Sequence, residues 1–180
     1  MRADARRNYE RLLGQARLAF AEYGADASLD DIARRAGVAS GTLYRHFPTR
    51  LDLIQAVLAE QLEELAELGR GLLTADDTFE ALSTWLRATL AHGLTYRGLS
   101  AAVMAAAVDA DLLKNWHAEL FEVGAELLRR AQAAGTIVDS AEAADVLKMV
   151  SAIAWASQDG SEAQAERMFT LLMNGLRRDG

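Results

Sequence analysis

The chain has 180 residues, of which 51% are hydrophobic and 25% charged, and it contains no cysteine. This composition is ordinary for a soluble globular protein, and the lack of cysteine excludes disulfides and thiolate metal sites. Because no apolar run is long enough to cross a membrane and the first residues lack a signal-peptide pattern, we expect a cytoplasmic protein.

The formal net charge of −7 by itself disfavours nucleic-acid binding, because contacts with phosphate need cations. The charges are spread unevenly, however. Residues 1–57 hold more basic than acidic side chains, and the remainder of the chain carries the whole acidic excess. Since the local field on one face governs contact with DNA, the acidic total does not exclude a DNA-binding protein.

The pattern predicts an all-α fold, because Ala, Leu, Glu and Arg dominate and alternating β-branched runs are missing. The first expected helix covers residues 5–23 and ends at Gly24. A short helix over 29–36 follows, with Ser28 as its N-cap and Asp31 three residues later. A third, very short helix covers 40–47 and ends before Pro48.

A long fourth helix is expected after Thr49, which caps it together with Asp52. Later helices are predicted over 78–96, 99–108, 112–134, 141–157 and 162–177, and the residues expected to separate them are Gly98, Asp109, Gly135, Asp159 and Gly160. We place a domain boundary within the fourth helix. This gives an N-terminal domain over 1–57 and a C-terminal domain over 58–180.

The first three helices are expected to pack into a compact unit around Phe20, Ile32, Leu43 and Phe47. A tight turn over 36–39 joins the second helix to the third. This is the geometry of a helix-turn-helix, in which one helix braces and the next lies in the major groove of DNA. Any small helical hairpin would share the same outline, so composition alone leaves both interpretations open.

A longer motif favours the helix-turn-helix. Residues 28–54 read SLDDIARRAGVASGTLYRHFPTRLDLI, and residues 19–24 before them read AFAEYG. Both segments closely resemble the DNA-binding signature of the TetR family of bacterial transcriptional regulators. The most specific part is the pattern Gly-x-x-x-Gly-Thr-Leu-Tyr-x-His-Phe between Gly37 and Phe47. The resemblance covers the first third of the chain, and the rest is similar to the family only in helical content and length.

The resemblance implies that the third helix is the recognition helix. Gly41 would let the backbone approach a base, and Thr42 would offer a hydroxyl to phosphate. Tyr44 combines a ring for a thymine methyl with a phenol for phosphate, and Arg45 would read guanine or pair with phosphate. The residues predicted to contact DNA are Ser40, Gly41, Thr42, Tyr44, Arg45, His46 and Arg50.

Two details qualify the expected DNA contacts. Many family members carry a hydroxyl residue where Ala39 stands and a basic or polar residue at Ser40. The helix therefore presents few long side chains to bases, and we expect DNA shape to contribute to recognition. Arg6 and Arg7 form either an arm that reaches DNA or a solvated face, whereas Arg34 and Arg35 are expected to be exposed and paired with Asp30 or Asp31.

The C-terminal part is rich in aromatic and methionine side chains, which suit an adaptable apolar cavity. In the family, helices from the middle of the chain enclose such a cavity for small ligands. The candidate ligand-binding residues are Trp85, His92, Met104, Trp116, Phe121, Met149 and Trp155. The alternative is that these residues fill a core that holds no ligand.

The last two helices carry apolar stripes that are expected to form a homodimer interface. The stripes consist of Leu147, Val150, Ala154, Phe169, Leu172, Met173 and Leu176. The alternative is burial of these stripes within their own subunit. A dimer is favoured because two helix-turn-helix units together can read a palindromic operator in double-stranded DNA.

Enzymatic, cofactor and metal chemistry find little support in the sequence. Asp109, Asp111, His117 and Glu119 are near each other, but His117 and Glu119 do not share a helix face, so no metal site is expected. No nucleophile motif or glycine-rich phosphate loop occurs, so no catalytic residue or cofactor is predicted.

The prediction is a sequence-specific regulator with a DNA-binding domain over 1–57 and an effector-binding and dimerisation domain over 58–180. It is a repressor that a small molecule of unknown identity releases from its operator. An architectural DNA binder without an effector, and a helical carrier or enzyme that has lost DNA binding, are the alternatives.

Overall fold

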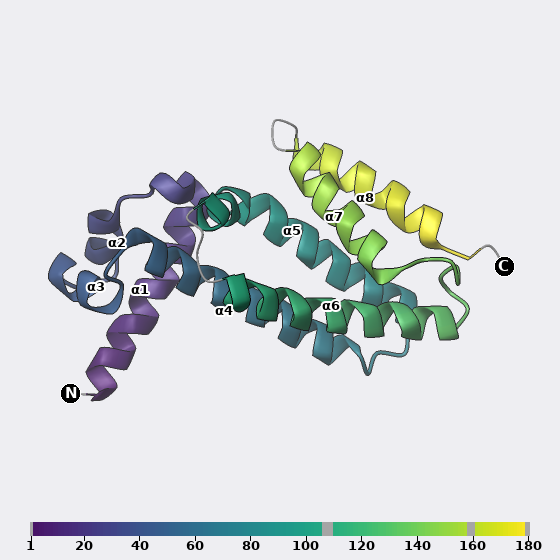
Figure 1. Cartoon of the computed structure of the whole chain (residues 1–180), viewed down its shortest axis with the longest axis horizontal. Coiled ribbons are helices and arrows are strands. Elements are labelled where there is room, and N and C mark those ends of the chain that lie inside the picture. The colour runs from purple at the N-terminus through teal and green to yellow at the C-terminus, as the bar shows by residue number, and fades with distance from the viewer. Residues whose placement is uncertain (1, 106–109, 158–160, 179–180) are drawn as a thin grey trace. The chain divides into compact units, whose positions relative to one another are not determined.

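The structure, a computed structural model, describes residues 2–105, 110–157 and 161–178, with the side chains of 2–3, 97, 100–105 and 110–117 left out. The described residues fold into helices, which confirms the predicted all-α class (Figure 1). In chain order they are α1 (Arg2–Tyr23), the 3₁₀ turn η1 (Gly24–Asp26), α2 (Leu29–Arg35), α3 (Ser40–His46), α4 (Arg50–Leu72), α5 (Thr78–Ala105), α6 (Ala110–Ala133), α7 (Ala143–Ala156) and α8 (Glu162–Leu176).

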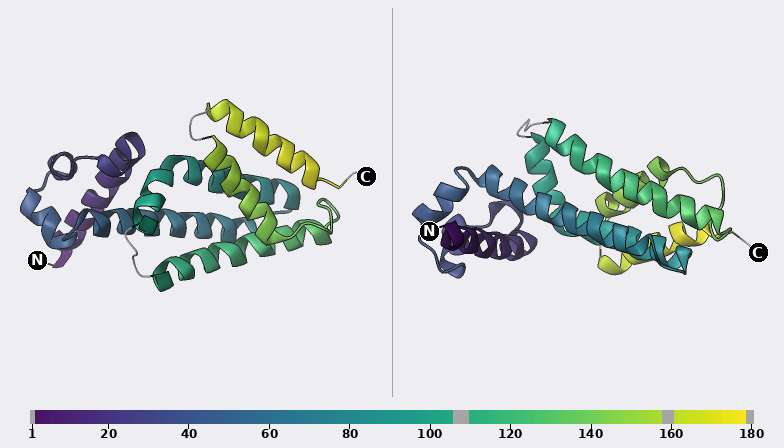
Figure 2. Two further views of the ribbon diagram at one scale, coloured as in Figure 1. Left: turned by 45° about the horizontal axis from the view of Figure 1, so that its top comes forward. Right: turned by 90° about the horizontal axis from the view of Figure 1, so that it is seen from below.

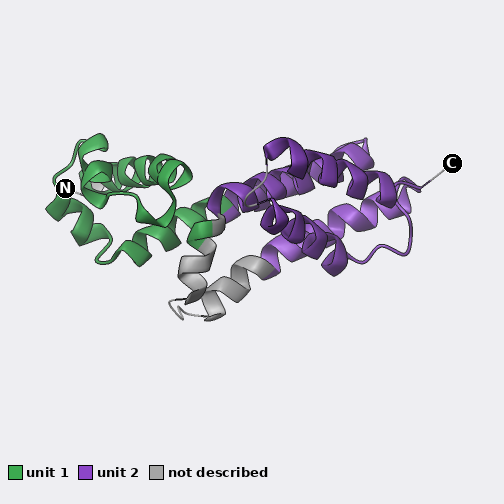
Figure 3. Cartoon of the chain, turned by 90° about the horizontal axis from the view of Figure 1, so that it is seen from above, with its two compact units in different colours: residues 1–61, 98–109 green, residues 62–97, 110–180 purple. Residues whose placement is uncertain are grey.

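The chain divides into two compact units (Figure 3). Unit 1 consists of residues 1–61 and 98–109, and unit 2 of residues 62–97 and 110–180. The helices α4 and α5 each contribute residues to both units.

The N-termini of α2 and α4 follow the predicted capping chemistry. The Ser28 hydroxyl accepts a hydrogen bond from the backbone N–H of Asp31 at 3.3 Å. At the start of α4, Thr49 Oγ1 accepts from the Asp52 N–H at 3.2 Å, and the Asp52 carboxylate accepts from the Thr49 N–H at 2.8 Å. These two caps satisfy backbone donors that would otherwise lack partners at a helix N-terminus.

One predicted break is wrong. The helix α5 continues from Thr78 through Gly98 to Ala105. Glycine in a helix interior costs only about 1 kcal/mol relative to alanine, and Gly98 keeps a negative φ, unlike Gly24, Gly37 and Gly135. The buried neighbour Leu99 anchors the helix at this point. The predicted breaks at Asp109, Asp159 and Gly160 lie outside the described residues.

Unit 2 is built around Trp85, whose side chain is fully buried. Its indole N–H donates to the backbone carbonyl of Leu65 in α4 at 3.0 Å, which satisfies the only polar atom of the ring. Around it pack apolar side chains from α5, α6, α7 and α8, among them Leu82, Leu127, Val150 and Phe169. Figure 2 shows α7 and α8 side by side, as this shared core requires.

None of the helices, as far as the structure describes them, combines the length and apolar character needed to span a bilayer.

Candidate nucleic-acid interface

The turn between α2 and α3 has helix-turn-helix geometry. After α2, Gly37 adopts a φ of +67°, a conformation that side chains other than glycine rarely tolerate. The N–H of Val38 then donates to the carbonyl of Ala33 at 3.0 Å, which closes the end of α2. After Ala39, the chain enters α3 at Ser40. The residues predicted to form the turn therefore form it.

Buried side chains hold α3 against the other helices of unit 1. Phe20, Ile32, Leu43 and Phe47 are all nearly inaccessible to solvent, as expected from their spacing. Leu43 points into this core from the middle of α3, while Phe47 follows its last turn. Because the inner side of α3 is fixed by packing, the residues between these anchors project from a rigid helix.

The outer side of α3 carries the residues predicted to contact DNA. Gly41, Tyr44 and Arg45 are exposed, and 47% of Tyr44 is accessible despite its large apolar ring. Ser40, Thr42 and His46 are half-buried at the edges of this face. The structure therefore brings six of the seven predicted residues together on one short helix, with donors and an aromatic ring available at its surface.

The Ser40 hydroxyl has a partner outside α3. Its Oγ donates to the carboxylate of Asp30, in the first turn of α2, at 2.7 Å. Asp31, the next residue along α2, instead accepts from the Arg34 guanidinium at 2.8 Å. That hydrogen bond holds the pKa of the Asp31 carboxyl below its ordinary value. The predicted pairing of the α2 arginines is thus seen for Arg34, while Arg35 lies 3.9 Å from Glu22 of α1.

Arg50 lies beside the turn before α2 and not on the face of α3. Its Nη1 donates to the carbonyl oxygens of Ala25 at 2.8 Å and of Ala27. Ala25 is part of η1, and Ala27 follows η1 before α2 begins. Arg50 therefore stabilises the segment before α2. We did not predict this role, because the local sequence pattern does not indicate contacts with residues more than twenty positions away. Its predicted contact with phosphate remains a prediction.

The Arg50→Met substitution is expected to lower the free energy of unfolding by about 1 kcal/mol. Methionine keeps the aliphatic stem of the side chain but leaves two backbone carbonyls without their hydrogen-bond donor. Chemical denaturation without DNA measures this change. Arg45→Met, which alters an exposed arginine of α3, is the control and should change the stability by less than about 0.5 kcal/mol. Equal stabilities of the two variants would contradict the structural role of Arg50.

Tyr9 of α1 is a neighbour of α3 that the prediction missed. Its ring centroid lies 5.9 Å from that of His46 and 5.2 Å from that of Phe47. Burial, followed by the charge of Glu60, raises the pKa of the Tyr9 phenol above its ordinary value. The spacing of Tyr9 to Leu13, Ala16 and Phe20 continues the apolar face of α1 by one turn, and this signal could have identified it.

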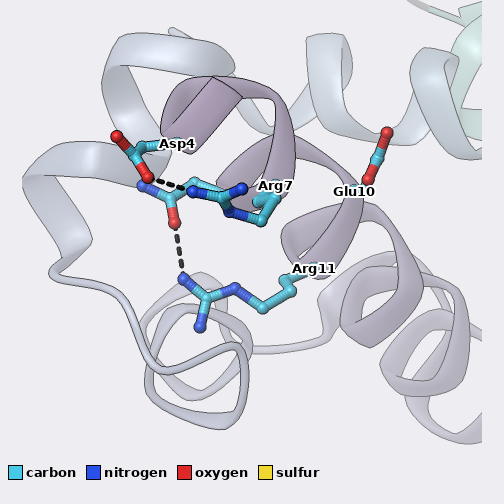
Figure 4. A pocket seen from close by; sticks show the side chains of 5 residues that line it. Asp4, Arg7, Glu10 and Arg11 are labelled. Atoms are coloured by element: carbon cyan, nitrogen blue, oxygen red, sulfur yellow. Dashed lines mark hydrogen bonds and ion pairs between the residues drawn. The ribbon is translucent and has the colours of Figure 1, made fainter. Parts of the chain in front are cut away.

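Arg6 and Arg7 are part of α1, so the structure does not show them as a separate arm. Arg6 lies 2.9 Å from Glu10, and Arg7 pairs with Asp4. A shallow depression along α1 is lined by Asp4, Arg7, Asn8, Glu10 and Arg11 (Figure 4). Exposed pairs of this kind are weak and exchange readily with solvent. Their arginines therefore remain able to approach phosphate, as one of the two predicted alternatives requires.

The predicted ligand-binding residues whose side chains the structure describes do not gather around one cavity. Trp85 fills the core of unit 2, whereas Met149 and Trp155 are exposed on α7 and Phe121 is exposed on α6. His92 is half-buried, with its ring 5.1 Å from that of Tyr96. The side chains of Met104 and Trp116 lie outside the described residues. A shallow groove in unit 2 is lined instead by Arg87, Leu90, Ala91, Leu94, Glu162, Ala163, Ala165 and Glu166.

Most residues of the predicted dimer stripes are buried within unit 2. Leu147 is half-buried, and the other six belong to the buried core: Val150, Ala154, Phe169, Leu172, Met173 and Leu176. Their burial favours the alternative interpretation, in which these stripes pack within their own subunit. The same helices expose other apolar residues: Met149 and Trp155 on α7, and Leu171 on α8.

Of the residues considered as metal ligands, the structure describes the side chain of Glu119 alone. Among the described residues, no three histidine or acidic side chains come together as metal ligands would. Glu119 pairs with Arg70 in α4, which also binds Glu63 at 2.7 Å. Asp109 lies outside the described residues, and so do the side chains of Asp111 and His117.

Comparison with known proteins bears directly on this interface. Residues 12–57 match the family model of bacterial regulatory proteins of the tetR family. Residues 77–178, more than half of the chain, match the model of the C-terminal domain of SbtR-like transcriptional regulators.

Individual relatives agree with these models. The HTH-type transcriptional regulator TtgW of Pseudomonas putida is 42% identical over 64 residues, 35% of this chain, and the chain spans only 48% of its length. The HTH-type transcriptional regulator UidR of Escherichia coli is 31% identical over 147 residues, 76% of this chain and 72% of UidR. The TetR transcriptional regulator SCO0520 from Streptomyces coelicolor, known from a crystal structure, is 33% identical in sequence to this chain. The two superpose with a TM-score of 0.78 over 95% of this chain and 99% of the SCO0520 chain.

The helix-turn-helix in unit 1, the matched C-terminal domain and these relatives lead to one conclusion. The chain belongs to the TetR family of DNA-binding transcriptional regulators.

Proposed function

We propose that this protein is a homodimeric repressor that binds a palindromic operator in the cytoplasm and is released from it by a small molecule. The observation that carries the proposal is the two-sided character of α3. Leu43 is buried in unit 1, while Gly41, Tyr44 and Arg45 face solvent on the other side of the same seven-residue helix. A rigid helix with an exposed mixture of backbone, ring and cation suits the major groove.

The assignment of roles on α3 follows from chemistry. Gly41 lacks a side chain, so DNA can approach the backbone there, while Thr42 and His46 offer donors to phosphate oxygens. Tyr44 places an aromatic ring beside a base or sugar and a phenol near phosphate. Arg45, the long cation of the exposed face, pairs with guanine or phosphate.

Exposed apolar residues on α7 and α8 support the proposed dimer. The helix α7 buries Val146, Val150 and Ile153, yet Met149 and Trp155 are 49% and 73% exposed, and Trp155 lies opposite the buried stripe. On α8, Leu171 is 72% exposed, and Gly175 nearby leaves room for a close approach. A helix that is apolar on both faces is typical of one that is covered on both faces. A second copy of the chain, related by twofold symmetry, would cover this surface.

The Trp155→Glu variant is expected to raise the dimer dissociation constant about tenfold or more, because each of two symmetric copies would bring a charge into an apolar interface. Sedimentation equilibrium over a range of concentrations measures this constant. Leu18→Glu, which adds the same charge at an exposed leucine of α1, is the control and should leave it unchanged. A wild-type chain that is monomeric, or a variant that dimerises equally well, would contradict the proposed interface.

We place the effector in unit 2, where the groove lined by Leu90, Leu94, Arg87 and Glu166 combines an apolar floor with a charged rim. Such a lining suits a small amphipathic molecule. Because α5 lines this groove and contributes residues to both units, a ligand that shifts α5 in unit 2 would also act on unit 1. Release of DNA would then be a population shift between dimers that fit the operator and dimers that do not.

A reporter gene tests repression and release together. A selected operator placed across a promoter should lower expression when the protein is present, whereas an activator would raise it. Candidate effectors are first identified as compounds that raise the melting temperature of the protein. They should then restore expression. Compounds that bind and stabilise the protein, yet all leave its affinity for DNA unchanged, would contradict the effector part of the proposal.

A further inference from the structure

The first residue of the recognition helix is held by a side chain from the bracing helix. Ser40 begins α3, and its Oγ lies 2.7 Å from a carboxylate oxygen of Asp30 in α2. An ionised carboxylate can only accept hydrogen bonds, so the hydroxyl must be the donor. The turn over 36–39 brings these two residues together although ten positions separate them in the sequence. The hydroxyl hydrogen of Ser40 is therefore already used in a hydrogen bond within the protein.

This hydrogen bond limits the bases that Ser40 can recognise. A serine hydroxyl has one hydrogen and two lone pairs, and only the lone pairs remain available here. At the major-groove edge, adenine and cytosine present an amino donor, while guanine and thymine present carbonyl oxygens that accept. A serine hydroxyl that can only accept hydrogen bonds can bind the amino groups of adenine and cytosine, but not the carbonyl oxygens of guanine and thymine.

We propose that Asp30 is a positioning residue that sets base specificity by making Ser40 an obligate acceptor, so that Ser40 selects adenine or cytosine on the strand it contacts. This inference rests on the proposed function, in which α3 enters the major groove. Asp30 acts through Ser40 and has no contact with DNA in this arrangement. Exchanging Asp30 therefore changes which base is preferred, and not only how tightly DNA is bound.

The neighbouring Asp31 provides a matched control. Both aspartates are exposed in the first turn of α2, and Asp31→Ala removes the same charge as Asp30→Ala. Both variants should bind DNA somewhat more tightly overall, because either loses one carboxylate that repels phosphate. Only Asp30→Ala frees the hydroxyl of Ser40, since the carboxylate of Asp31 binds Arg34. The cap formed by Ser28 survives in both variants because it uses the backbone N–H of residue 31.

The experiment uses the full chain and a duplex selected from a random library, in which every base pair of one half-site is replaced in turn. At one position the wild-type chain should prefer an amino base over guanine or thymine about fivefold, the value of one hydrogen bond. Asp30→Ala should reduce this preference to less than about twofold, while Asp31→Ala keeps it. Ser40→Ala should abolish it, and adding Asp30→Ala to Ser40→Ala should change nothing further at that position.

Two outcomes overturn the inference in distinguishable ways. If the wild-type chain binds a selected duplex but Asp30→Ala or Ser40→Ala keeps the wild-type preference at every position, Asp30 does not set specificity and the proposed function stands. If the wild-type chain enriches no duplex, the proposed function fails and the inference fails with it. Ser40→Ala leaves α2 unaltered, so it can overturn the inference even if Asp30→Ala proves poorly folded, because a preference that survives without the Ser40 hydroxyl cannot depend on it.

Discussion

Tyr44→Ala is expected to weaken binding to a selected operator about 30-fold, because each protomer loses about 1 kcal/mol of contact and the dimer contains two copies. The ring is exposed on α3 and is not part of the core of unit 1. Its removal should therefore leave the melting temperature of the free protein nearly unchanged. Fluorescence anisotropy with a labelled duplex measures the affinity, and thermal unfolding without DNA measures the stability.

Tyr23→Ala is the matched control for this prediction. Tyr23 is also an exposed tyrosine of unit 1, with 55% of its surface accessible, but it ends α1 and lies outside α3. Its loss should change DNA affinity by less than about twofold. If both tyrosine variants lose affinity equally, or if neither does, then the exposed face of α3 is not the surface that binds DNA.

Gly69→Ala is expected to destabilise the fold by about 2 kcal/mol or more through overpacking. A Cβ added at Gly69 would lie 2.2 Å from Cγ1 of Val123 and 2.8 Å from the indole nitrogen of Trp85. Neither neighbour can yield easily, since valine is stiff at χ1 and Trp85 is fully buried and hydrogen-bonded to Leu65. Chemical denaturation measures the free energy of unfolding.

Gly71→Ala, two residues further along α4, serves as the control. A Cβ at Gly71 would meet nothing within 4 Å, so only helix propensity changes. That change favours alanine by up to about 1 kcal/mol, and the variant should be as stable as the wild type or more so. A Gly69→Ala variant as stable as Gly71→Ala would show that α4, α6 and Trp85 do not pack as closely as described.

The architecture of unit 1 follows from its sequence because local signals and packing agree there. Ser28 with Asp31, and Thr49 with Asp52, form caps that require only a few adjacent residues. Gly37 marks a positive φ that the turn needs. Such short-range chemistry can be read without knowing the rest of the fold.

Other features depend on distant parts of the chain and were not predictable in this way. The role of Arg50 requires the carbonyls of Ala25 and Ala27, and the state of the Ser40 hydroxyl requires Asp30. Gly98 looked like a break, but tertiary burial around it outweighs the modest helix propensity of glycine.

The C-terminal helices show a different limit of periodicity. In α7, apolar residues occur on both faces, so spacing could not tell the face that packs in the subunit from the face left open. The stripe through Val150 and Ala154 is buried in the subunit, whereas Met149 and Trp155 remain exposed. Residue type and spacing alone therefore did not separate the positions that pack inside the subunit from those left exposed.

The most direct test of sequence-specific binding by a dimer is selection of duplexes from a random DNA library by the full chain, followed by a salt titration of the best sequence. The account predicts enrichment of a palindromic site whose affinity falls steeply as salt rises, because arginine contacts with phosphate release counterions. A library that remains unenriched at low salt, or enriched sequences without twofold symmetry, would contradict it.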